Sequence, residues 1–281
     1  MTRREAGYTR LIVFLALLVS LGFVGGFLSG LLGIGGGVVM IPLLLYAPPL
    51  LGFPALDIRK VGAMTMVQVF VASVLGYLAH HGRRATAPAV VLWMGSGMVV
   101  GAGAGALLSG AVSVRLLETV FALLALIAAP ILFFPPPADE LGEGGASDFS
   151  RPLALAGSLT IGLLSGLVGV GGAFLVIPFM IYLLGVPTRA ALGSSLGVLA
   201  VGGLGGVLGK FETGQIPLLW SALLCAGTVP GSWTGASVSR RIPARGLRLS
   251  LAILVALTAV RMLVGLMVAE RPLPGTTLRP S

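Results

Sequence analysis

Two glycine clusters are the part of this sequence best suited to bind a ligand. Gly26 to Tyr46 reads GFLSGLLGIGGGVVMIPLLLY, and Gly162 to Tyr182 reads GLLSGLVGVGGAFLVIPFMIY. Each glycine inside a helix costs about 1 kcal/mol relative to alanine, so we predict that a helix breaks in each cluster. A second helical fragment should then begin near Val38 and near Ala173. Its first backbone N–H groups lack partners within the helix and lie at its positive end, where an anion can bind.

Uncharged polar residues flank both clusters and are suited to complete an anion site. Ser29 and Ser165 precede the expected breaks by four residues, and further hydroxyl and amide groups follow in the next apolar segment of each half. The hydroxyls have an alternative role, because such groups in membrane helices commonly bond the carbonyl four residues earlier. The predicted site residues are Ser29, Gly33, Gly35, Gly36, Gly37, Thr65, Gln68, Ser165, Gly169, Gly171, Gly172, Ser194, Ser195 and Arg261. The Arg261 guanidinium either contacts the anion or extends to the membrane surface.

The glycines have two alternative explanations. Close helix packing is one, but packing favours small residues at every fourth position, as at Gly97, Gly101 and Gly105, and not in clusters. Nucleotide binding is the other, but the clusters lack the lysine of GxxxxGK[ST] and the spacing of GxGxxG. The sequence also shows no nucleophile with a base and no cluster with metal-ligand spacing, and Cys225 is its single cysteine. We therefore expect a protein that is not an enzyme and holds no cofactor or metal.

The composition places these elements in a membrane. Of 281 residues, 56% are hydrophobic and 10% are charged, with a mean hydropathy of +1.05. A soluble domain carries roughly 25% charged residues, so most of this surface must face lipid. The apolar runs lack the alternation of barrel strands and predict an all-α polytopic membrane protein. They cover residues 11–32, 61–79, 87–114, 119–134, 152–184, 190–209, 216–239 and 249–269.

The net charge of +9 does not indicate nucleic-acid binding here. In a membrane protein, basic residues gather in short loops and termini, where they contact lipid headgroups, and we place Lys210 in such a loop. Basic residues divide almost equally between the two sides of the membrane, whether the chain crosses eight or ten times. The positive-inside rule therefore selects neither arrangement.

The chain repeats itself. The two cluster segments are identical at 11 of 21 positions at an offset of 136, and an offset of 130 aligns Gly97, Gly101 and Gly105 with Gly227, Gly231 and Gly235. We predict a transmembrane repeat over residues 1–134, an acidic Pro/Gly linker loop over 135–151 and a second repeat over 152–281, with four to five helices in each repeat. Such repeats place a substrate site between the halves near the bilayer midplane. We favour inverted repeats, because they explain alternating access directly.

The twin motifs GFLSGLLGIGGGVVMIP and GLLSGLVGVGGAFLVIP, with ALGSSL at Ala191 to Leu196, resemble the TauE/SafE family, also called the 4-toluenesulfonate uptake permease family. The resemblance covers Leu11 to Val268. It implies transport of small sulfur-containing anions such as sulfite, sulfoacetate or related organosulfonates, often as export.

We therefore expect a secondary transporter in the cell membrane of a bacterium or archaeon. Its partners would be a small anionic substrate and the lipid bilayer, and a homodimer stays open as its assembly. Three alternatives also stay open. They are an anion channel at the same site, a carrier for a non-sulfur anion, and a structural membrane protein in which the glycines only pack helices.

Overall fold

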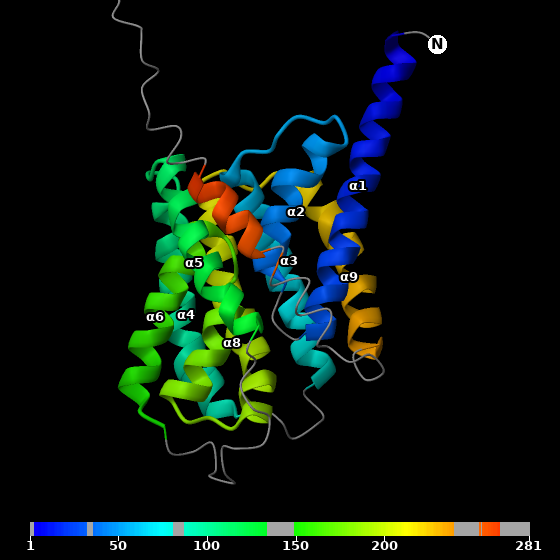
Figure 1. Ribbon diagram of the computed structural model, residues 1–281. Helices are drawn as coiled ribbons and strands as arrows, with labels where there is room; N and C mark the ends of the chain where they lie inside the picture. Colours follow the sequence, from blue (N-terminus) through cyan, green and yellow to red (C-terminus); the bar gives the residue numbers. More distant parts are fainter. Residues whose placement is uncertain are drawn as a thin grey trace, which may run out of the picture.

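The computed structural model describes residues 3–32, 36–80, 87–133, 149–238, 253 and 255–264, and the regular structure in these ranges is helical (Figure 1). Most of the predicted linker, residues 135–148 of 135–151, lies outside them. The helices are α1 (Arg3–Leu32), α2 (Gly37–Leu50), α3 (Ile58–His80), α4 (Pro88–Leu108), α5 (Val114–Phe133), α6 (Arg151–Val168), α7 (Ala173–Pro178), a π-helical turn η1 (Phe179–Leu183), α8 (Thr188–Glu212) and α9 (Leu218–Val238). A further apolar helix covers Val255–Val264.

Several helices suit a bilayer. Among the described residues, five helices are long and apolar enough to cross a membrane, and they contain Tyr8–Leu31, Ile58–Leu78, Pro88–Leu108, Arg151–Val168 and Ala190–Glu212. Large apolar side chains lie on the outside of the bundle, as at Leu92 and Leu208. Such a surface belongs in lipid, so the predicted all-α polytopic membrane protein is confirmed.

Glycine stripes bring two pairs of helices into backbone contact. A Cβ atom on Gly101 or Gly105 of α4 would overlap a carbonyl oxygen of α6. The same holds for Gly227, Gly231 and Gly235 of α9, whose backbone lies against the carbonyl oxygens of Val19, Phe23 and Phe27 in α1. Small residues at every fourth position therefore pack helices, as the sequence predicts.

Helices α3 and α8 run antiparallel and touch along much of their length. A Cβ on Gly76, near the end of α3, would lie 3.2 Å from the Leu196 side chain near the beginning of α8. Near the opposite ends, a Cβ on Gly206 of α8 would overlap the Met66 side chain of α3. By contrast, α4 runs parallel to α8. Gly95 of α4 contacts Val201 of α8, and further along both helices Val99 of α4 contacts Gly205 of α8.

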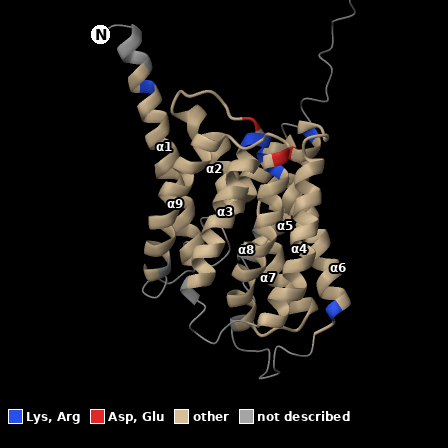
Figure 2. Ribbon diagram, turned by 180° about the vertical axis from the view of Figure 1, so that it is seen from behind, with Lys and Arg blue, Asp and Glu red and all other residues tan. Residues whose placement is uncertain are grey.

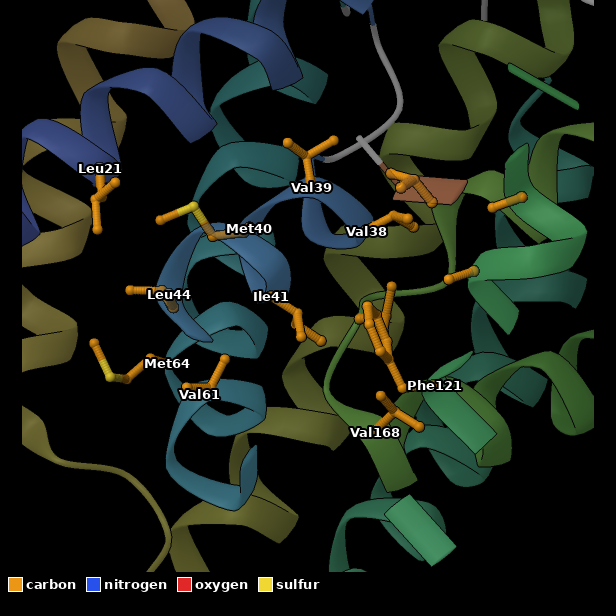
Figure 3. Packing of buried hydrophobic residues seen from close by; sticks show 14 of the residues in the cluster. Leu21, Val38, Val39, Met40, Ile41, Leu44, Val61, Met64, Phe121 and Val168 are labelled. Carbon is orange, nitrogen blue, oxygen red and sulfur yellow. The ribbon is translucent and has the colours of Figure 1, made fainter. Parts of the chain in front are cut away.

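Two apolar clusters form the core. One joins α1, α2, α3, α5, α9 and the Val255–Val264 helix with the end of α6 and the start of α7, and the other joins α4, α6, α7 and α8. Figure 3 shows the centre of the first, where Val38 and Ile41 of α2 face Phe121 of α5 and Val168 at the end of α6. The start of α2 and the end of α6, which border the two glycine clusters, therefore share one core.

Candidate anion-binding site

The chain reverses direction at the first glycine cluster. Gly36 has a left-handed backbone with φ of 66°, and a Cβ there would lie 3.2 Å from the Ser29 Cβ and 2.8 Å from the Gly25 carbonyl oxygen. The start of α2 therefore lies against the last turns of α1. At the other end, the rings of Phe14 and Phe53 are 5.3 Å apart, so the segment runs back along α1.

The second cluster makes a corresponding turn. Helix α6 ends at Val168, and α7 begins at Ala173. Three glycines between them are left-handed, with φ of 90° at Gly169, 81° at Gly171 and 74° at Gly172. Glycine adopts this backbone without the steric cost that a Cβ imposes. A Cβ on Gly172 would lie 3.2 Å from the Ser165 Cβ, so this turn also folds back on the helix before it.

The two turns touch. A Cβ on Gly37 would overlap the carbonyl oxygen of Val170 and would lie 3.0 Å from Val69 Cγ2 of α3. The same Val69 side chain would overlap a Cβ on Gly171, and Gly62, two turns earlier on α3, lies against Gly169. We call this meeting of the two turns with α3 the glycine junction. It consists of Gly37, Gly62, Val69 and Gly169–Gly171.

Helix α3 presents two polar side chains beside the glycine junction. Thr65 lies three residues after Gly62 and four before Val69, so the three share one helix face. Thr65 and Gln68 are fully buried, and neither Thr65 Oγ1 nor either polar atom of the Gln68 amide has a hydrogen-bond partner. A Cβ on Gly25 of α1 would lie 3.2 Å from Gln68 Nε2. Because Gly25 also lies against Gly36, the Gln68 amide is near the first glycine turn. A buried polar atom without a partner costs about 1–3 kcal/mol, so these atoms are suited to a ligand.

The two predicted serines lie at the turns themselves. Ser29 and Ser165 are both buried, and the Ser165 hydroxyl has no partner. The Ser165 carbonyl accepts the N–H of Gly169 at 2.7 Å and the N–H of Val170 at 3.3 Å. These bonds close the end of α6 and fix the Ser165 backbone beside the second turn.

The two helix starts are unequal. Helix α2 has 14 residues, whereas α7 has six and changes into a π-helical turn after Pro178. Pro178 lies at this change, but proline alone does not cause it, because α2 has Pro42 at the matching position and continues as an α-helix. Val39 and Met40 donate to the Gly36 carbonyl, so the N–H groups of Gly37 and Val38 precede the first bonds of α2. The helix dipole at the junction therefore comes mainly from α2.

Three other predicted residues have different surroundings. The Ser194 hydroxyl accepts the Ala87 N–H at 2.8 Å at the start of α4, and the Ser195 hydroxyl donates to the Leu192 carbonyl at 2.9 Å. The Arg261 guanidinium lies 4.7 Å from the centre of the Tyr46 ring and is exposed. Gly33 and Gly35 lie outside the described residues. An anion contact at these positions stays a prediction.

Lys210 is the residue that sequence analysis misplaced. The prediction of a loop is wrong, because the side chain lies fully buried near the end of α8. Its ammonium donates to Ser109 Oγ at 2.7 Å, to Gln215 Oε1 at 3.1 Å and to the Leu167 carbonyl at 3.2 Å. The charge itself ended the predicted apolar run at residue 209, although the helix continues. The available signal was the spacing of four from Gly206, which shares a helix face with Lys210 and packs on α3.

Known proteins resemble this chain over most of its length. The family model described as "Sulfite exporter TauE/SafE" matches residues 18–262. The Probable membrane transporter protein YunE of Bacillus subtilis is 22% identical, with 88% of this chain and 96% of that protein covered. A probable membrane transporter protein of Haemophilus influenzae is 26% identical over 89% of this chain and 98% of its own, and one of Xylella fastidiosa is 30% identical over 68% and 71%.

No solved structure matches the chain significantly. The family match spans both glycine turns and every helix from α2 to α9. The relatives are named as membrane transporters and not as enzymes, and the apolar helices agree with that class. This protein belongs to the TauE/SafE family of membrane transporters.

Proposed function

We propose that the protein is a secondary carrier that moves a small sulfur-containing oxyanion, such as sulfite or an organosulfonate, through the cell membrane. The observation that supports this most is the set of buried polar atoms without partners around the glycine junction. They belong to Thr65 and Gln68 of α3 and to Ser165 of α6. The name of the matching family, sulfite exporter, supports the choice of anion.

The junction offers the chemistry that an oxyanion requires. Two hydroxyls and one amide N–H₂ can donate to its oxygens, as the surrounding water does in solution. The backbone N–H groups of Gly37 and Val38 at the positive end of α2 add further donors. These groups are neutral, so they hold the anion without an ion pair that would resist its release.

We also propose that the two halves are inverted repeats, each with a helix broken at its glycine turn. The offset of 130 matches α3 to α8, and these two helices run antiparallel. The matched glycine stripes make matched contacts, because α9 packs on α1 of the other half and α4 packs on α6. In inverted repeats, movement of one half against the other opens a central site to each side in turn.

A thermal-shift measurement on the purified, detergent-solubilised protein tests the site. A ligand that binds the folded state raises its apparent stability by mass action. We expect sulfite or another sulfur oxyanion to raise the melting temperature more than acetate, chloride or taurine does. The Thr65→Val variant removes the unpartnered hydroxyl with little change in shape, and it should show a smaller shift with the same anion.

Ser221→Ala is the matched control for Thr65→Val. Ser221 is also a buried hydroxyl without a partner, but it lies near the start of α9. Its neighbour Leu224 contacts Gly22 of α1, about two turns before Ser29. Ser221→Ala should keep the full anion-dependent shift. An unchanged shift in Thr65→Val, or the same loss in both variants, would count against an anion site at the junction.

A further inference from the structure

A buried cation near the junction has no role in the site proposed above. Lys210 is fully buried, and its three hydrogen-bond acceptors, Ser109 Oγ, Gln215 Oε1 and the Leu167 carbonyl, are all uncharged. A charge inside a protein is costly unless an opposite charge or a strong set of dipoles compensates it. The end of the α6 dipole at Leu167 compensates part of the charge.

A second cation lies beside it. The Arg59 side chain is half-buried at the beginning of α3, and its Nη2 donates to the Val112 carbonyl at 2.6 Å. Its Nε is buried and has no hydrogen-bond partner. Arg59 binds the Val112 carbonyl and Lys210 binds Ser109 Oγ, three residues earlier in the same turn, so the two cations lie near each other and repel.

In the described ranges, no carboxylate is hydrogen-bonded to the side chain of Arg59 or of Lys210. Glu118 is half-buried and lies near Asp57 and Arg115. Asp57 is exposed, and its Oδ1 accepts the backbone N–H of Arg59 at 2.9 Å. Glu212, two residues after Lys210, is exposed. Figure 2 shows Lys and Arg together with Asp and Glu at one end of the bundle, near the start of α3. The buried positive charge lies just inside that end.

We infer that Arg59 and Lys210 form a second binding site for a small oxyanion, between the charged end of the bundle and the glycine junction. Leu167, which binds Lys210, is two residues before Gly169 of the junction. An anion at the Arg59–Lys210 site is therefore one short step from the junction. That the ligand is the transported oxyanion rests on the proposed function, whereas the need for an anion rests on the buried Lys210 and the half-buried Arg59 beside it.

The hydrogen bonds allow an anion to enter without leaving a buried group unpaired. The Arg59 Nε–H is free to donate to one oxygen of the anion. Lys210 can exchange its 3.1 Å bond to Gln215 Oε1, an atom of a half-buried side chain, for a second oxygen of the anion, while it keeps its bonds to Ser109 Oγ and the Leu167 carbonyl. Both new bonds would join two charged groups, whereas the bond to Gln215 joins the ammonium to a neutral amide.

Equilibrium dialysis of the purified full-length chain with radiolabelled sulfite tests the Arg59–Lys210 site by counting bound anions. We expect two sulfite ions per wild-type chain and one in Lys210→Met, a variant that keeps the length of the side chain and removes its charge. Arg59→Gln should also lose one, and Lys210→Arg should keep both. Lys60→Gln is the matched control, because this exposed residue follows Arg59 and its charge is at the same end.

The outcomes separate this site from the junction. Loss of one anion in Lys210→Met and of the other in Thr65→Val supports both sites. If Lys210→Met binds as many anions as the wild type while Thr65→Val loses its anion, the second site is overturned and the junction stands. If only the Lys210 and Arg59 variants lose binding, the second site stands and the junction fails. Equal loss in Lys60→Gln would show a general charge effect and overturn the inference.

Discussion

The Gly37 backbone lies against the carbonyl oxygen of Val170, so closely that a Cβ on Gly37 would overlap it. This contact joins the two glycine turns. It explains why residue 37 is glycine, whereas the matching position of the second glycine cluster is Ala173. The single added methyl group of Gly37→Ala therefore tests the contact between the turns.

We expect Gly37→Ala to lower sulfite transport at least tenfold, because the methyl group must separate the two turns. Overpacking of this kind also costs stability, typically about 1–3 kcal/mol. Ala173→Gly, which adds no atom at the matching position, should keep transport within about twofold. Uptake into proteoliposomes and the melting temperature in detergent measure the two effects. Full transport by Gly37→Ala would show that the contact is unimportant for function.

Gly171 and Gly185 separate backbone strain from contact at the junction. Both are left-handed, with φ of 81° and 66°, but a Cβ on Gly171 would overlap Val69, whereas one on Gly185 has nothing within 4 Å. Alanine at either position costs about 1–2 kcal/mol of strain. We expect both Gly171→Ala and Gly185→Ala to melt at a lower temperature, and only Gly171→Ala to lose transport. Equal transport by the two variants would contradict the proposed role of the turn.

Gly101 and Gly103 of α4 test the glycine stripe. A Cβ on Gly101 would overlap the Leu159 carbonyl of α6, whereas one on Gly103 would make an ordinary contact at 3.5 Å. Gly101→Ala should therefore lower the melting temperature in detergent. Gly103→Ala should match or exceed the wild type, because alanine favours the helix by up to about 1 kcal/mol. Comparable destabilisation in both variants would argue against close packing as the function of the stripe.

Much of this architecture could be predicted from the sequence. Hydropathy places most of the helices, since a bilayer demands long apolar runs, and spacing identifies the stripe at Gly97, Gly101 and Gly105. The glycine clusters mark where the helices stop, since glycine both weakens a helix and permits a left-handed turn. The starts of α2 at Gly37 and α7 at Ala173 lie at or next to the predicted fragment starts.

Other features depend on tertiary contacts that spacing does not encode. Thr65 and Ser194 are both hydroxyl residues in a long helix that follows a glycine cluster. In the structure, Ser194 accepts the Ala87 N–H, whereas the Thr65 hydroxyl has no hydrogen-bond partner. The burial of Lys210 depends on acceptors from the residue that follows α4, from α6 and from the segment after α8, which lie far apart in the chain. A hydropathy average registers the charge of Lys210 but contains no information about hydrogen-bond acceptors from other segments.

The most direct test of the account is counterflow of radiolabelled sulfite in proteoliposomes, with Gln68→Leu beside the wild type. Gln68 is fully buried, and both polar atoms of its amide lack partners, so leucine removes a ligand contact while it keeps the volume filled. We predict saturable exchange that unlabelled sulfite inside the vesicles accelerates, and a rate at least tenfold lower in folded Gln68→Leu. An unaltered rate in Gln68→Leu, or a sulfite conductance without exchange, would contradict a carrier that binds its anion at the glycine junction.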